Sequence, residues 1–161
     1  MMKQKILVIL TGVLCIGGVA MANLATNEGA LGGITPGSDV EYVTEIYGIP
    51  DVDGPAKYVA AWSEYGKVVK YGDSVSFWCT GKSENGPFHV MSMCISANNG
   101  FATPRGIHVG STRREVYRAY GKPTVNQNNG KDWWYNVNRR GNIVFHFKGD
   151  VVNSINLGWD A

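Results

Sequence analysis

Beyond residue 22, the side chains that could carry chemistry in this chain are three histidines and two cysteines, which are far apart in the sequence. His89, His108 and His146 lack the spacing of a metal site. The motifs of serine hydrolases, zinc hydrolases, redox Cys-x-x-Cys pairs and dinucleotide-binding loops do not occur. A nucleophile made of Cys79 or Cys94 with His89 would define a small hydrolase, which we keep as one alternative. We therefore expect a non-enzymatic protein with no catalytic residues, no metal and no cofactor.

Cys79 and Cys94 are also the candidates for a disulfide, because an even pair of cysteines in an exported protein typically forms one. Closing the loop of about 15 residues between them would add about 3 kcal/mol of stability by the loop-entropy estimate. When the two halves of the chain are aligned, Cys79 corresponds to the core-facing Phe147 and Cys94 to the outward-facing Asn156. The disulfide therefore requires a bulge that brings both cysteines to one face of the sheet.

Tryptophans form the next group of candidate functional residues. The alternation of residues 133–138 places Trp133 and Tyr135 on the face of a strand that packs against a helix. The opposite face mixes aromatic, amide and imidazole side chains, and such a mixture is typical of protein-binding surfaces. The candidate binding residues on this face are Trp134, Asn136, His146 and Asn156, together with Trp78 in the first half. The alternative is that they are ordinary sheet residues, partly covered by the other half.

Charge divides the chain into two halves of opposite sign. Residues 23–100 contain four lysines and nine acidic residues, a net charge of −5, whereas residues 101–161 contain nine basic and four acidic residues, a net charge of +5. A chain that is neutral beyond residue 22 is not typical of a nucleic-acid binder, so we expect no nucleic-acid partner. Arg113, Arg114 and Arg118 form a candidate basic patch in the second half. Such an asymmetry either solvates two faces or orients a partner.

The elements that must position these residues are indicated by an internal repeat. The segment Ile34–Pro50 returns as Ile107–Pro123 at a constant offset of 73 residues. Seven of seventeen positions are identical without a gap, which indicates two copies of one supersecondary unit. The identical pairs are Ile34/Ile107, Gly37/Gly110, Ser38/Ser111, Val43/Val116, Tyr47/Tyr120, Gly48/Gly121 and Pro50/Pro123.

Each copy is expected to begin with a short helix and to continue as antiparallel strands. Asp39 and Thr112 are the expected N-caps, and Gly48 and Gly121 are expected to end the helices in αL geometry. The expected strands are 57–65, 68–80 and 88–96 in the first copy, with an interruption at Gly72, and 133–138, 142–148 and 151–157 in the second. The predicted fold class is therefore α+β, with two tandem repeats. Each repeat is a short helical segment followed by a three-stranded antiparallel sheet, with a fourth strand allowed in the first.

The N-terminus has the pattern of a bacterial export signal. Lys3 and Lys5 precede an apolar run of about fourteen residues, and Ala20-Met21-Ala22 matches a signal-peptidase site. A retained anchor is the alternative, although the run is shorter than the roughly 20 residues of a spanning helix. Cys15 follows a leucine and does not form a lipobox, so membrane contact is left open. The predicted organisation is a signal peptide over 1–22, a flexible segment over 23–32, repeat 1 over 33–96, a linker over 97–105 and repeat 2 over 106–161.

The pattern Gly-Ser-x-x-x-x-Val-x-x-x-Tyr-Gly-x-Pro, followed by a Trp-Tyr strand and a strand ending in Phe, resembles the BamE (SmpA/OmlA) envelope domain. It is also similar to the repeats of beta-lactamase inhibitor protein. The segment 110–157 matches a whole unit and the segment 37–95 matches one more loosely. The BamE resemblance implies a helix followed by three strands, an outer-membrane-facing location and a role in β-barrel protein assembly. The inhibitor resemblance implies two repeats whose sheets join into one concave surface that grips another protein.

The sequence therefore predicts an exported protein-binding module in the periplasm or cell envelope, with association with the outer membrane left open. Its expected role is that of an accessory factor in envelope or outer-membrane protein assembly, and its expected partner is another envelope protein. The first alternative is an inhibitor of a periplasmic or extracellular enzyme such as a beta-lactamase. The second is the small Cys/His hydrolase. No sequence feature identifies the partner.

Overall fold

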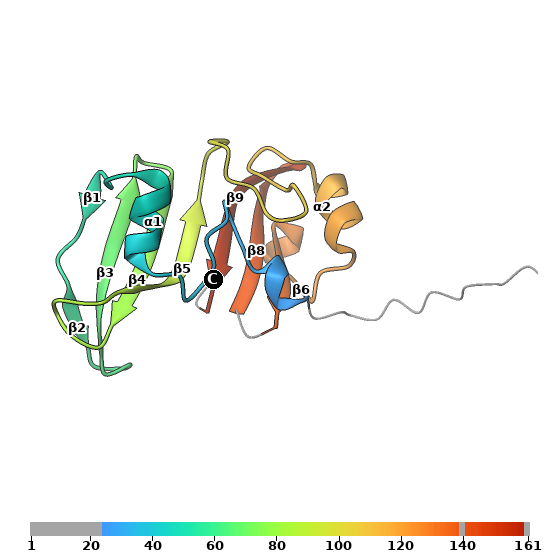
Figure 1. Cartoon of the computed structure of the whole chain (residues 1–161). Coiled ribbons are helices and arrows are strands. Elements are labelled where there is room, and N and C mark those ends of the chain that lie inside the picture. The colour runs from blue at the N-terminus through green and yellow to red at the C-terminus, as the bar shows by residue number, and fades with distance from the viewer. Residues whose placement is uncertain (1–23, 139–140, 160–161) are drawn as a thin grey trace, which may run out of the picture.

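The computed structural model describes residues 24–138 and 141–159 and consists of one antiparallel sheet with two short helices on one of its faces (Figure 1). The helices are α1 (Val40–Tyr47) and α2 (Arg113–Tyr120), and 3-10 turns occur at Thr26–Glu28 and Asn128–Gly130. The strands are β1 (Val52–Asp53), β2 (Lys57–Val59), β3 (Glu64–Tyr71), β4 (Val75–Gly81), β5 (His89–Ile95), β6 (Val125–Gln127), β7 (Asp132–Val137), β8 (Gly141–Lys148) and β9 (Val151–Gly158).

The predicted α+β fold of two tandem repeats, each a short helix followed by its own three-stranded sheet, is wrong, because the protein is mainly one antiparallel sheet of nine strands with two short helices among the described residues. The order is β1-β3-β4-β5-β9-β8-β7-β6, with β2 also paired to β3. The two halves join where β5 pairs with β9, with Met93 opposite Leu157 and Ile95 opposite Ile155. A three-stranded sheet in each half would leave the edges of β5 and β9 unpaired, and pairing them satisfies these backbone groups and continues the apolar face.

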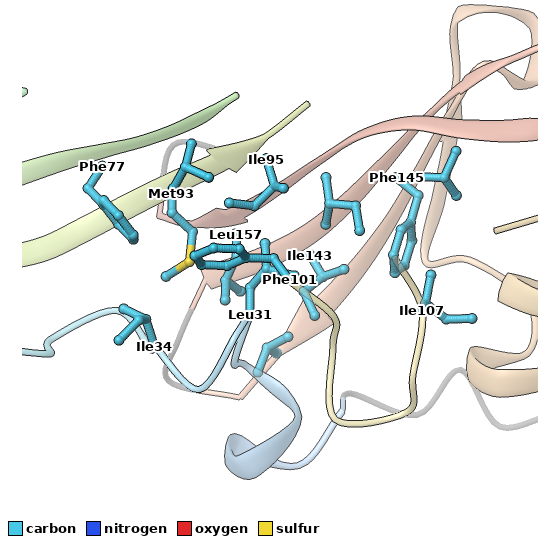
Figure 2. Close-up of a cluster of buried hydrophobic side chains, with 14 of the residues drawn as sticks. Leu31, Ile34, Phe77, Met93, Ile95, Phe101, Ile107, Ile143, Phe145 and Leu157 are labelled. Atoms are coloured by element: carbon cyan, nitrogen blue, oxygen red, sulfur yellow. The ribbon is translucent and has the colours of Figure 1, made fainter. Parts of the chain in front are cut away.

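The core lies between the sheet and the segments that cover one of its faces. A row of side chains crosses six strands on this face, from Val69 through Phe77, Met93, Leu157 and Ile143 to Tyr135. Figure 2 shows the loop residues Leu31, Ile34 and Phe101 over the middle of this row.

The segments that precede and join the two halves contribute to this core. The N–H of Leu24 donates a hydrogen bond to the carbonyl of Asn136 on β7, and the carbonyl of Leu24 accepts one from the N–H of Asn138, which follows this strand. Leu31 is fully buried. In the segment 97–105, Phe101 and Thr103 are buried. Residues 24–32 are therefore a packed covering segment and not the expected flexible one. The expected linker likewise contributes Phe101 and Thr103 to the buried interior, although several of its other residues are exposed.

The internal repeat of the sequence corresponds to two equivalent sets of hydrogen bonds at the starts of the two helices. The Gly37 N–H donates to the carbonyl of Val90 at 2.7 Å, and the Gly110 N–H donates to the carbonyl of Val152 at 2.8 Å. The N–H groups of Val90 and Val152 donate back to Ser38 and Ser111, both at 2.8 Å. Each helix start is therefore attached to the last strand of its own half, β5 or β9. The helices dock on the sheet through buried residues, of which Val43 and Val116 are the central ones.

The caps of the two helices differ in detail from the prediction. Thr112 is the expected N-cap and forms a capping box, with its N–H donating to Glu115 Oε2 at 2.6 Å, whereas the Asp39 side chain makes no cap hydrogen bond among the described residues. Gly48 (φ 83°, ψ −166°) and Gly121 (φ 73°, ψ −151°) have positive φ but are not in the αL region. They lie in an extended region of positive φ that only glycine adopts readily.

Several strand boundaries also differ from the prediction. The expected strand 57–65 is a hairpin, because β2 and β3 are joined by a turn in which Ser63 has a φ of 54°. The expected interruption of 68–80 at Gly72 is confirmed, because β3 ends at Tyr71 and β4 begins at Val75. The short edge strands β1 and β6 were not predicted, because two or three exposed residues carry no alternation.

The predicted signal peptide over 1–22, with Cys15, lies outside the described residues. Within residues 24–138 and 141–159, no helix is long and apolar enough to span a membrane.

Candidate functional site

The face of the sheet opposite the helices is the candidate functional site, and we call it the open face. Both helices dock on the other face, which contains the core row (Figure 1). Most side chains of the open face are half-buried within the described chain, and Asn136 is exposed. The open face consists of Val68, Ser76, Trp78, Thr80, Ser92, Cys94, Trp134, Asn136, Asn142, Val144, His146, Ser154 and Asn156.

The predicted alternation of the second half is confirmed. Trp133 and Tyr135 face the core, with Trp133 opposite Phe145 and Tyr135 opposite Ile143. Trp134 and Asn136 lie on the open face, in the rows that contain Val144 and Asn142. The five predicted binding residues therefore lie on one continuous surface, on strands β4, β7, β8 and β9.

Trp78 is held at one end of the open face by a neighbour that the sequence analysis did not select. Its ring lies over Gly66 of β3, where any side chain would collide with the indole. Trp62, in the turn between β2 and β3, contacts the Trp78 ring edge-on with 6.3 Å between centroids and is 41% exposed. The two tryptophans form an aromatic cluster whose outer member is open to solvent. The turn was not predicted, because residues 57–65 were expected to form one continuous strand.

Trp134 lies at the other end of the open face and is also partly covered. It stands opposite Val144, which is fully buried although it faces away from the core. The neighbour of Val144 on the other side is Asn156 of β9. The indole nitrogen of Trp134 and the side-chain oxygen of Asn156 are both buried and have no hydrogen-bond partner among the described residues. Trp134 thus has a packing role, covering Val144, as well as an accessible surface.

His146 forms a charged or polar contact that fixes its ring at the margin of the open face. Its Nδ1 lies 2.8 Å from Oδ1 of Asp132, the residue opposite it on β7. The side chain of Asn128 donates a hydrogen bond to the other oxygen of Asp132. Partial burial alone would raise the pKa of Asp132, but the hydrogen bonds from Asn128 and His146 outweigh it, and the pKa lies below its usual value. Asp132 was not selected from the sequence because it precedes the alternating apolar pattern.

The predicted disulfide between Cys79 and Cys94 is wrong, and both thiols are free. Cys79 is fully buried on the core face opposite Val90, whereas Cys94 lies on the open face opposite Ser76. A register shift does occur between Trp78 and Cys79, but it leaves the two cysteines on opposite faces. Burial raises the pKa of Cys79 to about 12 and also raises that of Cys94. Both thiols are therefore poor nucleophiles at neutral pH.

Of the three arginines in the predicted basic patch, Arg113 makes structural contacts, whereas Arg114 and Arg118 are exposed. Arg113 donates hydrogen bonds to the carbonyls of Gly130 at 2.5 Å and Gly149 at 3.1 Å, and its guanidinium lies 4.0 Å from the centroid of the Phe147 ring. It therefore fastens α2 to the sheet. Arg114 and Arg118 are exposed and form no ion pair within the described part of the chain.

A cavity of about 550 Å³ beside α1 is the second candidate site. On its wall, Nδ1 of His89 lies 2.6 Å from Oδ1 of Asp39, which would orient the imidazole as an acid or base. Lys67 pairs with Asp53 at 2.6 Å and lies over the ring of Phe88. The residues that line this cavity include no serine, threonine or cysteine, so the pair has no adjacent nucleophile there. No group of three or more potential metal ligands occurs among the described residues.

Comparisons with known proteins add little to this geometry. No family model matches the sequence, and no curated protein matches it either. Among solved structures, a cysteine-rich secretory protein from Staphylococcus aureus subsp. aureus Mu50 is similar, with a TM-score of 0.37 and 11% identity over 86% of this chain. The chain spans 50% of the length of that protein. A likeness of this size supports no conclusion about the present fold or function.

Proposed function

We propose that this chain is an exported, non-enzymatic protein-binding module that holds another envelope protein on its open face. The observation that carries the proposal is the continuity of this face across both halves of the sheet, from Trp78 to Trp134. Tryptophans in partly covered positions are frequent centres of binding energy, and the hydroxyl and amide groups between them supply hydrogen bonds without a large desolvation cost.

The role that we propose is that of an accessory factor in envelope or outer-membrane protein assembly. An inhibitor of a periplasmic or extracellular enzyme is the second candidate. The pairing of β5 with β9 favours this second role, because one surface that spans both halves is what the inhibitor resemblance implies. The hydrolase alternative is weakened by the raised pKa values of Cys79 and Cys94, since neither thiol would ionise readily.

Site-specific photocrosslinking in the cell that makes the protein tests the proposed surface. A photoreactive residue at Ser92 or Asn136 on the open face should crosslink a partner, whereas one at the exposed Tyr58 should not. Trp134→Ala should reduce the crosslinked product about fivefold or more, because truncating a central interface tryptophan usually costs at least about 1 kcal/mol of binding. Crosslinks from Tyr58 alone would contradict the proposal.

The identity of the crosslinked protein separates the two roles. An assembly factor should crosslink to a component or a client of envelope assembly, and the partner should remain active in the complex. An inhibitor should crosslink to an enzyme whose activity falls stoichiometrically as the purified protein is added.

A further inference from the structure

Two pairs of charged residues occupy equivalent positions on the two helices but carry opposite signs. The offset of 73 residues relates Glu41 to Arg114 and Glu45 to Arg118. The helices themselves are equivalent, because Val43 and Val116 are buried at corresponding positions and both helices begin on the last strand of their own half. The acidic pair and the basic pair are therefore presented by the same surface of the same element, at opposite ends of the sheet (Figure 1).

The charged pairs have no close ion-pair partner in the described part of the chain, although Glu115, three residues before Arg118, offsets part of the positive charge on α2. All four side chains are exposed, and within residues 24–138 and 141–159 none of them forms an ion pair. On each helix the like charges are four residues apart, a spacing at which they repel each other and destabilise the helix. An opposing surface with the same spacing and the opposite sign would relieve both repulsions at once.

Exposed apolar side chains lie beside both pairs. Tyr42 and Ile46 on α1 are 45% and 46% exposed, and Ile49 after the helix end is 90% exposed. On α2, Tyr117 is 52% exposed and lines a shallow groove with Trp133, Arg114 and Arg118. The α1 surface is thus apolar with an acidic margin, and the α2 surface is a groove with a basic margin.

We propose that α1 of one copy of this protein binds α2 of a second copy, with Glu41 and Glu45 opposite Arg114 and Arg118. Charge complementarity selects this partner, because the half that contains α1 has a net charge of −5 and the half that contains α2 has a net charge of +5. Contacts between two α1 helices or two α2 helices would place like charges together. Since each copy has both surfaces, the contact either closes in a dimer or repeats along a chain.

Sedimentation velocity of the purified protein over a range of concentrations tests the proposal. We expect reversible self-association that weakens as the salt concentration rises. The variant Glu41→Arg/Glu45→Arg, whose two helices are both basic, should lose it, and so should Arg114→Glu/Arg118→Glu, whose two helices are both acidic. In each variant the dissociation constant should rise at least about tenfold. Lys57→Glu/Lys70→Glu changes the net charge by the same amount as the second variant, but on strands β2 and β3 and not on a helix, and should associate like the natural chain.

Mixing the two charge-reversed variants gives the decisive result. Each alone should be monomeric, and an equimolar mixture should associate, because a basic helix then meets an acidic one. The quadruple variant, in which both pairs are exchanged, should regain the natural behaviour. A protein that stays monomeric throughout, or a mixture that does not associate, would overturn the proposal. Binding of the monomer to anionic phospholipid vesicles through Arg114 and Arg118, with no self-association, would overturn it as well.

Discussion

The hydroxyl of Tyr135 donates a 2.9 Å hydrogen bond to the carbonyl oxygen of Gly121, and so connects strand β7 to the end of α2. The same contact occurs in the first half, where the hydroxyl of Tyr71 donates to the carbonyl of Gly48 at 2.9 Å. Each helix is only eight residues long, so it cannot be stable alone and depends on such attachments. The glycine at each helix end presents its carbonyl to the tyrosine.

Replacing either of these glycines should destabilise the protein. At Gly48 and Gly121 a new Cβ would meet no atom within 4 Å, so the cost comes from backbone strain alone. A residue other than glycine in this region of positive φ costs about 1–3 kcal/mol. Gly121→Ala should therefore cost nearly as much as Gly121→Val, and both Gly48 variants should behave alike. Urea denaturation midpoints measure the effect, and midpoints equal to that of the natural protein would contradict it.

The two helices and the alternation of the strands could be predicted from the sequence because they depend on local features. The identical residues between Ile34 and Pro50 and between Ile107 and Pro123 define a start, one buried face and an end for each helix. The single sheet could not be predicted in the same way. The pairing of Met93 with Leu157 joins residues 64 positions apart, and alternation within β5 or β9 does not specify which strand is the neighbour.

The adjacent tryptophans of β7 should respond differently to truncation. Trp133 packs edge-on against Phe147, with 5.0 Å between centroids, and lies under the Arg113 guanidinium. Trp133→Ala should therefore cost about 3 kcal/mol of unfolding free energy. Trp134→Ala should cost about 1–2 kcal/mol, because it uncovers the buried Val144 on the open face but opens no cavity in the core.

Trp134→Phe is the matched control for this pair, since it keeps an aromatic cover over Val144. Chemical denaturation of Trp133→Ala, Trp134→Ala and Trp134→Phe in parallel measures how much unfolding free energy each variant loses. A larger loss for Trp134→Ala than for Trp133→Ala would mean that the open face, and not the helix side, carries the main core.

Both thiols should be free in the protein as the cell makes it. Cys79 is fully buried with a pKa of about 12, so an aromatic disulfide reagent should modify it only when the protein unfolds. Cys94 is half-buried with a raised pKa and should react in the native protein, but more slowly than a thiol in a short peptide. Titration in denaturant without reductant should count both thiols in the chain that lacks residues 1–22, and a third, that of Cys15, if these residues are retained. Finding neither would show that they are bonded, which the register of β4 and β5 forbids.

In the candidate site, the face on which each residue lies could be predicted from the sequence, but the contacts of these residues could not. Trp134, His146 and Asn156 could be assigned to one face from the alternation of side chains along each strand alone. The partners that fix these residues come from elsewhere. Trp62 contacts Trp78 from the turn between β2 and β3, and Asp132 contacts His146 from the neighbouring strand β7. Such contacts depend on which strands are neighbours, and this information is not local.

The Asp132 carboxylate should make the stability of the protein sensitive to acid. Its pKa is lowered in the folded state because the hydrogen bonds from Asn128 and His146 outweigh the effect of partial burial. In the unfolded chain an aspartate titrates near pH ~3.9. Above that pH the carboxylate is ionised in both states, and its contacts contribute their full stability. As the pH falls below it, the unfolded state takes up the proton first, so this contribution decreases until the folded carboxyl is protonated too.

Comparing the natural protein with Asp132→Asn isolates this contribution. The substitution should lower the unfolding free energy by about 1 kcal/mol at neutral pH, where it removes charge-assisted hydrogen bonds from a well-covered side chain. The difference should shrink as the pH is lowered from about 5 to about 2, because protonation gradually gives the natural side chain the same neutral state. Asp73→Asn, at an exposed turn, is the control and should change stability by less than about 0.5 kcal/mol. A difference for Asp132→Asn that stays constant over this range would mean that the carboxylate contacts do not stabilise the fold and that the edge of the open face near His146 is held by packing alone.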